Sequence, residues 1–526
     1  MINTLLRKWF FARLKLPRDV HRFAFRKFAN RPMIQFEDRA ITYGEMQDRV
    51  YRLAAAWAAF GITKGDTVFV QADSTETYFT ARFAALEAGV VITLFHAGHS
   101  PAFVLSAAQA ANPKLLILDE ASCPDCKTLL ATHMPNLPIW ETGKGGALQR
   151  AMSANQPKPS SNVIAPSDPM TLIFTSGTTG APKGVISSHR ATILSIKMVI
   201  ANLKGSPDRN APNVTLSAIP MAGAGSGLIL PTCLGGGTLV VQNHYTCENL
   251  VALIERFKVT RLFLTPSQLI DIIDTPTSED SRLASLNHVI YGTSAMPAAK
   301  LEEAIKRFGP IFQQGYGQAE VLPPVSLLSV ADHLDHGEIA PRHILRSCGK
   351  VVEGVAVKVI DPQGNALANG ETGEILVKTP TRFSTYLNPT QNQDVILDDG
   401  FFRTGDHGVL DDTGYLSVVN RTADIIHTKH GTIFPRNIEE EAHDVPAVKE
   451  CSMVEINGSA TLCVSLRTQF KTTDTSQIVT EISALLAERL PQWMLPSSIQ
   501  IFDEIPRSYL GKIVRNQLKE QLKHAN

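Results

Sequence analysis

One segment combines the residue types that hold a polyphosphate. In Thr171–Val185, TLIFTSGTTGAPKGV, an apolar run leads into hydroxyl residues, glycines and a lysine. Glycines let the backbone fold closely round phosphate oxygens, hydroxyls donate to phosphate and can ligate Mg²⁺, and a lysine supplies positive charge. The GxxxxGK[ST] order of a Walker A loop is absent. A flexible Gly/Thr surface loop is the alternative, but the preceding apolar run and Lys183 favour a phosphate loop.

The same segment resembles the phosphate-loop signature of the ANL superfamily of adenylate-forming enzymes, which comprises acyl- and aryl-CoA synthetases, peptide-synthetase adenylation domains and luciferases. Further segments follow in the family's order. They are Gly292–Pro297, similar to the Gly-Gly-x-Pro stretch beside the adenine, Gly315–Glu320 (GYGQAE), similar to YGxTE, Gly405-Asp406 within RTGD, Arg421, and Lys512 within PRSYLGKIVR. The resemblance extends from about residue 30 to 522.

The resemblance implies a set of site residues. The implied catalytic residues are Lys512, Glu320 and Thr178, and the implied metal ligands are Thr178 and Glu320. The implied ATP- and AMP-binding residues are Thr175, Ser176, Gly177, Thr178, Thr179, Gly180, Lys183, Ser294, Ala295, Tyr316, Gly317, Gln318, Ala319, Glu320, Asp406, Arg421 and Lys512. The implied acid pocket comprises Gly223, Ala224, Gly225, Gly292 and Thr293, the implied hinge is Ala423, and the implied thiol-side loop is Lys429, His430 and Gly431.

The residue types suit these implied roles. Tyr316 offers a ring for stacking on adenine, and Asp406 offers two acceptors for the ribose hydroxyls. Glu320 is a hard oxygen ligand of the kind that Mg²⁺ prefers. In the implied reaction a carboxylate attacks the α-phosphate and pyrophosphate leaves, so Lys512 can cancel charge between two anions. The structural alternatives are a turn residue for Asp406, a helix-start carboxylate for Glu320 and a surface lysine for Lys512.

Several positions depart from the family pattern. Ala319 stands where a threonine usually precedes the metal-binding glutamate, and Ala423 stands at a hinge position that is commonly Asp or Lys. His430 lies where a glycine is expected, although a one-residue shift would give that role to Gly431. Asn437 replaces a glutamate, and the connection between the two strands that follow is short. Because these differences fall on the thiol side, the acceptor of the acyl group stays open.

The implied acid pocket is also unusual. In PMAGAGSG, which begins at Pro220, Gly223 stands where many acyl-CoA synthetases have a histidine. The small residues either make room for a bulky or branched acyl chain or reflect tight packing of backbone on backbone. No aspartate is present in this segment to pair with a substrate ammonium, so a fatty, hydroxy or aryl acid is favoured over an α-amino acid.

The elements that must position these residues follow an α/β pattern. Tyr43–Phe60, Tyr78–Ala88 and Leu250–Phe257 have helical periodicity, and Thr67–Gln71, Leu115–Leu118, Thr238–Gln242, Arg261–Leu264 and His288–Tyr291 are strand-like. Such alternation predicts parallel sheets covered by helices. Short β-like runs with turn residues follow, and a helix is predicted over Val514–Lys523. We therefore predict an N-terminal adenylation domain over 1–420, with a β-rich subdomain at about 345–420, and a small mobile α+β domain over 421–526.

Composition limits the function classes. At 526 residues the chain exceeds the ~250–300 residues of one core, so several units are expected. Lys+Arg and Asp+Glu are equal at 50 each, which predicts no nucleic-acid partner. No run of about 18 uncharged apolar residues predicts a membrane-spanning helix, and seven cysteines favour a reducing cytoplasm. The basic start, MINTLLRKWFFARLK, is interpreted as a surface helix, with a transit peptide or a membrane-contacting helix as alternatives.

The leading hypothesis is a ligase that uses ATP and Mg²⁺ to convert a small carboxylic acid to an acyl-adenylate and then transfers the acyl group to CoA. A carrier-protein phosphopantetheine thiol is the nearest alternative acceptor. Intramolecular capture of the adenylate, as in β-lactone synthetases, is a third. A catalytically silent nucleotide- or acyl-binding homologue is the non-enzyme alternative, and the joint presence of Lys183, Glu320, Asp406, Arg421 and Lys512 argues against it.

Overall fold

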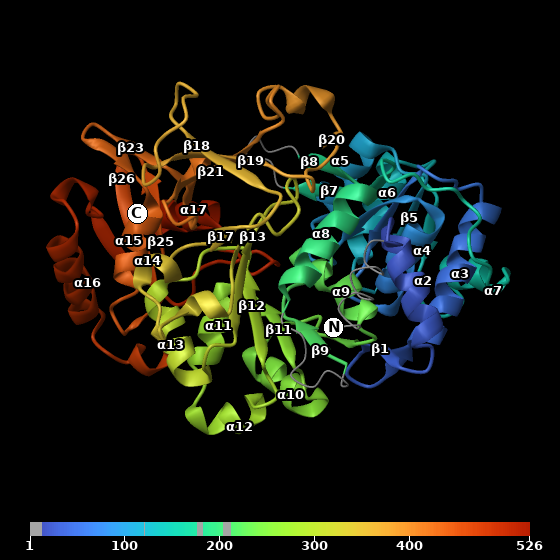
Figure 1. Ribbon diagram of the computed structural model, residues 1–526, viewed down its shortest axis with the longest axis horizontal. Helices are drawn as coiled ribbons and strands as arrows, with labels where there is room; N and C mark the ends of the chain where they lie inside the picture. Colours follow the sequence, from blue (N-terminus) through green and yellow to red (C-terminus); the bar gives the residue numbers. More distant parts are fainter. Residues whose placement is uncertain (1–12, 120, 176–181, 204–211, 526) are drawn as a thin grey trace.

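Figure 1 shows the computed structural model, which describes residues 13–119, 121–175, 182–203 and 212–525. Most of the basic N-terminal segment lies outside the described residues, and so do the predicted phosphate-loop residues Ser176, Gly177, Thr178, Thr179 and Gly180. The strands on either side of that loop are described.

Two large sheets form the body of the N-terminal domain. The first contains, in spatial order, β20 (Thr385–Tyr386), β8 (Lys183–Ser188), β7 (Pro169–Thr175), β4 (Val91–Phe95), β3 (Thr67–Gln71), β5 (Leu115–Leu118) and β6 (Ile139–Glu141). The second contains β17 (Lys350–Val351), β14 (Ser326–Leu328), β13 (Phe312–Tyr316), β12 (His288–Gly292), β11 (Arg261–Leu264), β9 (Val214–Ser217), β10 (Thr238–Val241), β1 (Pro32–Gln35) and β2 (Ala40–Thr42). The central strands of both sheets pair in parallel, and β5 is buried along its whole length, as expected for a parallel strand under helices.

Helices pack on both sheets. They are α2 (Pro17–Lys27), α3 (Tyr43–Ala59), α4 (Glu76–Ala88), α5 (Pro101–Ala111), α6 (Pro124–His133), α7 (Ala147–Ser153), α8 (His189–Asn202), α9 (Ile229–Leu234), α10 (Cys247–Phe257), α11 (Pro266–Ile273), α12 (Asp280–Leu283), α13 (Ala298–Phe308) and α14 (Arg342–Leu345). A capping box of Thr42 and Glu45 begins α3, and Thr265 and Gln268 form another at α11. One apolar cluster contains residues of both sheets and of the helices on them, and another lies under helices of the second sheet, so the sheets hold fixed positions for the loops at their strand ends.

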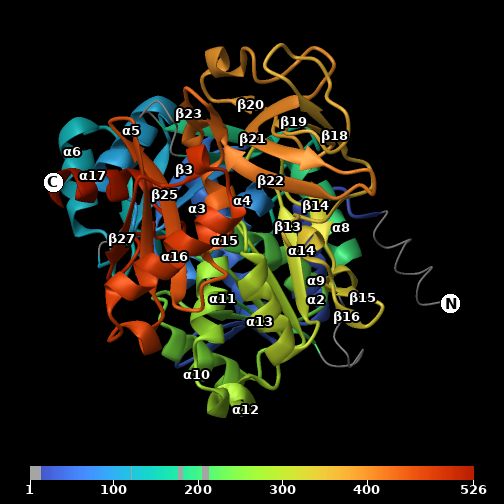
Figure 2. The same cartoon turned by 90° about the vertical axis from the view of Figure 1, so that its left-hand side faces the viewer.

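The remaining elements form two smaller units. Strands β18 (Ala356–Ile360), β19 (Gly373–Lys378), β21 (Phe402–Leu410) and β22 (Leu416–Arg421) make an antiparallel sheet. After it, β25 (Val448–Ile456), β26 (Ser459–Leu466) and β27 (Ser498–Phe502) pack with α15 (Pro435–Ala442) and α16 (Thr475–Arg489), and α17 (Arg515–Ala525) ends the chain. Figures 1 and 2 show these C-terminal elements, in orange and red, on one side of the two large sheets. The fold is thus α/β, with a large N-terminal and a small C-terminal domain.

The predicted elements agree closely with the structure. The strands predicted over Thr67–Gln71, Leu115–Leu118 and Arg261–Leu264 have those bounds. Helix α4 begins two residues before the prediction, at Glu76, and α10 begins three residues before it, at Cys247. The reason at α10 is the Thr246 side chain, which accepts a hydrogen bond from the Asn249 N–H and caps a polar first turn that apolar periodicity does not reveal.

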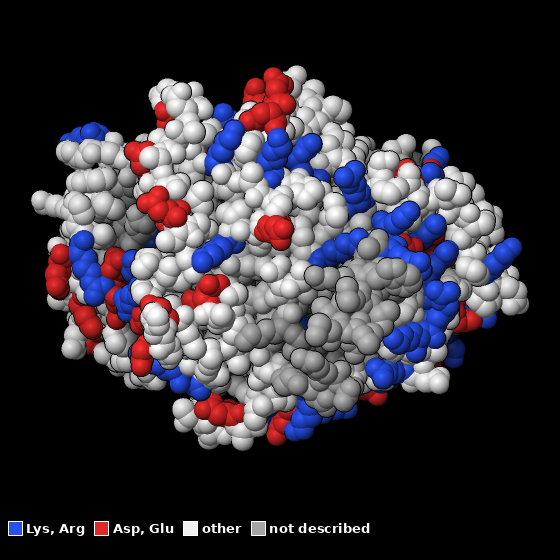
Figure 3. Space-filling view, viewed as in Figure 1, with Lys and Arg blue, Asp and Glu red and all other residues white. Residues whose placement is uncertain are grey.

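The described surface carries both acidic and basic side chains. In the face drawn in Figure 3, acidic and basic side chains are interspersed over the C-terminal elements at the left. Lys and Arg gather on the right flank, over α2 and α3, and the sequence of α2, PRDVHRFAFRK, is itself basic. Among the described residues, every helix is too short or too polar to cross a bilayer.

Candidate active site

The buried carboxylate of Asp406 connects segments that were predicted from the sequence to bind the nucleotide. Asp406 lies in β21 opposite Arg421 of β22 and is only 2% exposed. Its Oδ2 accepts hydrogen bonds from the Tyr316 hydroxyl at 2.6 Å and from Gln318 Nε2 at 2.5 Å. Its Oδ1 pairs with Arg421 Nε at 2.7 Å. The Tyr316, Gln318, Asp406 and Arg421 side chains therefore form one connected polar cluster, which we call the Asp406 cluster.

Lys512, in the C-terminal domain, lies close enough to this cluster for its charge to interact with those of Arg421 and Asp406. Neighbouring protein atoms desolvate the ammonium in part, while the residue as a whole is exposed. This desolvation, reinforced by the charge of Arg421 and opposed by that of Asp406, lowers the pKa of Lys512. A lysine at this place can hold a positive charge between two anionic reactants, which is the role that the sequence predicts for it.

A second group lies around Glu320. The Tyr386 hydroxyl donates to Glu320 Oε1 at 3.1 Å, and the Lys183 ammonium lies 5.7 Å from the centre of the Tyr386 ring. Burial, with the nearby Glu320 charge, raises the pKa of Tyr386, so its hydroxyl remains a donor. The arrangement arises because β20 pairs with β8, which places Tyr386 opposite Val185, two residues after Lys183. Sequence analysis missed Tyr386, since no local spacing links it to a glutamate 66 residues away.

The end of β12 and the loop after it carry the predicted residues Gly292, Thr293, Ser294 and Ala295. Gly292 pairs with Gly315, so this loop lies next to the end of β13, which carries Tyr316. Thr293 has a φ of 74°, and its buried Oγ1 has no hydrogen-bond partner among the described residues. A β-branched residue with such a φ is strained, and strain of this kind clusters at functional sites.

The glycines of the predicted acid pocket have different surroundings. A Cβ on Gly225 would lie 2.5 Å from the Ile219 carbonyl oxygen, so tight backbone packing requires this glycine and it leaves no space for an acyl chain. A Cβ on Gly223 would lie 2.7 Å from Cδ2 of Leu510, a residue of the C-terminal domain. The space beside Gly223 is therefore filled by the other domain, and only Ala224 of the three is exposed.

The predicted thiol-side loop is a separate hairpin. Strands β23 (Ile426–Thr428) and β24 (Gly431–Ile433) flank Lys429 and His430, and Lys429, His430 and Gly431 are all exposed. Gly431 has a φ of 149°, and a Cβ there would lie 3.1 Å from the Trp493 ring. A glycine is needed at 431, which favours the one-residue shift that the sequence left open. The predicted hinge residue Ala423 is exposed in the short 3₁₀ turn Thr422–Asp424.

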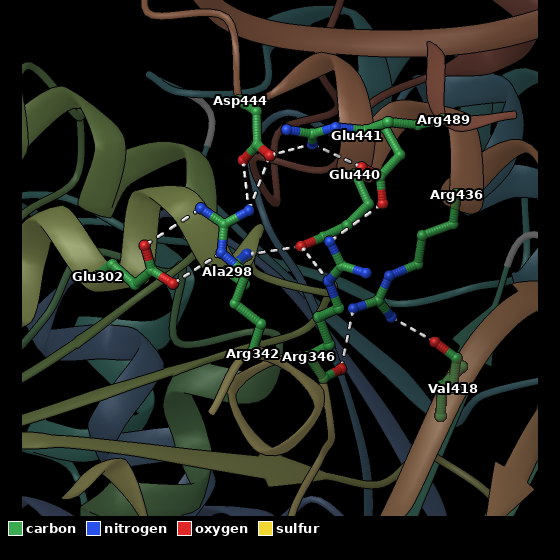
Figure 4. Close-up of polar contacts among 10 residues, drawn as sticks. All are labelled: Ala298, Glu302, Arg342, Arg346, Val418, Arg436, Glu440, Glu441, Asp444 and Arg489. Carbon is green, nitrogen blue, oxygen red and sulfur yellow. Dashed lines mark hydrogen bonds and ion pairs between the residues drawn. The ribbon is translucent and has the colours of Figure 1, made fainter. Parts of the chain in front are cut away.

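An ionic network joins the two domains beside the site (Figure 4). Glu440 of α15, 8% exposed, accepts from the Ala298 N–H at the start of α13 at 2.8 Å and from Arg346 Nε at 3.0 Å. Asp444 accepts two hydrogen bonds from Arg342, at 2.7 and 2.8 Å. Arg342 also donates to Glu302 of α13 at 2.8 Å. These contacts connect the small domain to α13 and α14, and so they help to fix the position from which Lys512 enters.

Further contacts extend this interface. Arg436 donates to the backbone oxygens of Val418 and Arg346 (Figure 4). Within the small domain, Arg489 pairs with Glu441 and Asp444, two of the residues at the interface (Figure 4). Arg467 binds two residues of the large domain, Asp274 at the end of α11 and Glu303 of α13.

Comparison with known proteins agrees with this geometry. A family model described as AMP-binding enzyme matches residues 21–387. Among curated proteins, the chain is 29% identical over 513 residues to a medium/long-chain-fatty-acid–CoA ligase, FadD8, of Mycobacterium tuberculosis, covering 93% of this chain and 87% of that one. It is 27% identical over 495 residues to a fatty acid–[acyl-carrier-protein] ligase, ScoC, of Streptomyces coeruleorubidus, covering 93% of each.

Solved structures show the same fold. The anthranilate CoA ligase AuaEII, solved with anthranoyl-AMP, superposes with a TM-score of 0.87 at 21% identity, covering 97% of this chain and 98% of that one. With the family model matching more than half of its residues, this chain belongs to the AMP-binding enzyme family.

Proposed function

We propose that this protein is an AMP-forming acid–thiol ligase, which activates a carboxylic acid with ATP and transfers the acyl group to CoA. The observation that carries the proposal is the position of Lys512, which approaches the Asp406 cluster from a different domain. Asp406, Tyr316 and Arg421 provide acceptors, an aromatic ring and a guanidinium, and the small domain provides the Lys512 cation. Such a site can bind a nucleotide and neutralise two anions that must meet.

We assign the nucleotide side as follows. Asp406 would bind the ribose hydroxyls, and the Tyr316 ring and residues 292–295 would contact the adenine. Lys183, which follows the phosphate loop, would supply positive charge to the triphosphate. The polar, partly buried surroundings of Glu320 fit Mg²⁺, because one carboxylate oxygen is held by Tyr386 and a carboxylate is a hard oxygen ligand. When bound there, Mg²⁺ would neutralise phosphate charge. Thr178, the other ligand predicted from the sequence, lies outside the described residues.

The reaction then needs little covalent chemistry from the chain. The acid's carboxylate oxygen attacks the α-phosphorus, the bond to the bridging oxygen breaks, and pyrophosphate leaves with its electron pair. In this proposal Lys512 and Arg421 would balance the negative charge that the two reactants bring together, and Lys183 would balance that of the departing phosphates. Preorganised charges of this kind are usually the largest single contribution to catalysis.

We further propose that the chain divides into 1–420 and 421–526, with Ala423 as the hinge. Elements beyond Arg421 have a core of their own, which includes Ile438, Leu462 and Ile482. They contact the large domain largely through ion pairs, and polar interfaces of that kind are typical of domains that move. A cytoplasmic location is supported by the free thiols of all seven cysteines.

The substrate acid is proposed as a fatty, hydroxy or aryl acid, and CoA as the acceptor. A carrier-protein thiol is the second candidate, because one relative that aligns over 93% of this chain is a fatty acid–[acyl-carrier-protein] ligase. Incubation with ATP, Mg²⁺, a panel of acids and either CoA or a phosphopantetheinylated carrier protein, followed by mass spectrometry, separates the two. Release of pyrophosphate without any CoA thioester would refute the CoA assignment.

A further inference from the structure

The hairpin that carries Lys512 enters the large domain tip first. Tyr509, Leu510 and Gly511, the three residues that precede Lys512, each contact a different element of that domain. Tyr509 lies against the loop after β4, Leu510 against Gly223, and Gly511 against Thr265 at the start of α11. The lysine is therefore the end of a segment whose depth of entry is set by contacts other than its own.

The contact of Leu510 is the tightest of the three. A Cβ on Gly223 would lie 2.7 Å from Leu510 Cδ2, while the next nearest atom, the Pro220 oxygen, would be 3.5 Å away. For comparison, a Cβ on Gly511 would lie 3.3 Å from Thr265. The branched side chain of Leu510 thus occupies the space that a side chain at position 223 would need.

Tyr509 fixes the direction of the tip. Its hydroxyl lies 2.8 Å from His99 Nε2, and its ring lies parallel to that of His96, with 9° between the planes and 5.3 Å between the centres. His96 is in turn 3.3 Å from Asp73. Burial lowers the pKa of His99 to about 4, so near neutral pH its ring is uncharged.

The hairpin is stiff enough to transmit a displacement to Lys512. The Ser508 N–H donates to the Lys512 carbonyl oxygen at 2.8 Å, and the Gly511 N–H donates to the Ser508 oxygen at 2.8 Å. Arg507 and Ile513 form an antiparallel bridge at the base of the turn. If Leu510 is pushed outward, these bonds carry Lys512 with it.

We propose that Leu510 is a positioning residue, which fills the space left by Gly223 and thereby sets how far the Lys512 ammonium reaches toward Asp406 and Arg421. The proposal rests on the proposed function, in which Lys512 acts on the adenylation step. It also explains why the small residue at 223 does not enlarge the acid pocket in this arrangement of the domains.

Size-change variants test the proposal. Because a leucine side chain can rotate away from a single methyl group, Gly223→Ala should lower the rate of acid-dependent ATP–pyrophosphate exchange only about two- to five-fold, and Gly223→Val by more than about twenty-fold. Adding Leu510→Ala to Gly223→Val should recover at least about a third of the rate lost, which is the rescue expected of a size-matched pair. Gly235→Val is the matched control, since a Cβ there would approach nothing closer than 3.6 Å.

The results that would overturn the proposal are distinct. If Gly223→Val raises KM for the acid, leaves kcat unchanged and is not rescued by Leu510→Ala, position 223 acts on the acid and the assignment to Leu510 is wrong. In a Lys512→Ala background, Gly223→Val should lower the exchange rate by less than about two-fold, because both changes act through the same lysine. If Gly223→Val lowers the exchange rate of Lys512→Ala as much as it lowers that of the wild type, the proposal is also refuted.

Hydrogen exchange separates this proposal from the proposed function. Amides of residues 506–514 should exchange faster in Gly223→Val than in wild type or Gly235→Val, and slower again when Leu510→Ala is added. This result does not require activity. If no acid supports pyrophosphate exchange in the wild type, the proposed function fails, while unchanged amide exchange in Gly223→Val refutes the positioning role by itself.

Discussion

Replacing Asp406 with asparagine removes the charge on which the Asp406 cluster is built while keeping its shape. In the structure, Oδ2 accepts from Tyr316 and Gln318, and Oδ1 pairs with Arg421. An asparagine has one acceptor and one donor, so in either orientation at least one of these donors meets an NH₂ group. The same change removes one of two acceptors proposed for the ribose hydroxyls.

The expected loss follows from these contacts. A hydrogen bond to a charged group contributes about 1.5–3 kcal/mol. The Arg421 pair is worth less, about 0.5–1 kcal/mol, because the arginine side chain is 55% exposed. A combined loss of about 2–4 kcal/mol corresponds to a fall of about 30- to 900-fold in kcat/KM for ATP.

The assay is acid-dependent ATP–pyrophosphate exchange at varied ATP, with circular dichroism to establish that the variant is folded. Asp361→Asn is the control, because that carboxylate lies in an exposed turn of the β-rich sheet where it binds Asn365. If Asp406→Asn retains kcat/KM for ATP within two-fold of wild type, the assignment of the Asp406 cluster to the nucleotide is wrong.

Three further predictions concern charge. ATP–pyrophosphate exchange should be fastest while Lys512 is protonated and should decline as pH rises through its pKa, which is lowered from the ordinary lysine value of 10.5. Arg421→Gln removes a positive neighbour and should therefore move this decline to higher pH. A pH profile that does not move would contradict the coupling between Arg421 and Lys512. Glu320→Gln should raise the Mg²⁺ concentration for half-maximal rate by about ten-fold or more, whereas an unchanged requirement would exclude Glu320 as a ligand. Glu440→Ala leaves the Ala298 N–H and Arg346 Nε without their acceptor, although Arg346 keeps its pair with Glu441. The free energy of unfolding should therefore fall by about 1–3 kcal/mol in denaturant titration, with less than additive loss when Arg346→Ala is added.

The sequence revealed much of the fold because its signals are local. A run such as Leu115–Leu118 is apolar at every position, and that pattern is enough to place a buried parallel strand. The start of α10 was less predictable, since its first turn is polar and is defined by a side-chain cap at Thr246. The residues proposed to bind nucleotide were likewise found from short segments, each with its own turn or charge pattern.

Contacts between distant segments could not be found in this way. Tyr386 meets Glu320 only because β20 adds to the edge of the sheet that contains β8. Tyr509 meets His99 across 410 residues, in a contact that depends on how the two domains dock. Gly223 was interpreted as spare room or tight packing, and the structure shows a third situation, in which Leu510 occupies the space.

The central claim is that Lys512, delivered by the small domain, catalyses adenylate formation. Acid-dependent ATP–pyrophosphate exchange by wild type and Lys512→Ala tests it most directly, with the acid first identified by screening pyrophosphate release. Removing a positioned positive charge that stabilises the transition state should slow exchange by about 10²–10³-fold, with little change in KM for ATP. Exchange by Lys512→Ala at the wild-type rate would contradict the account.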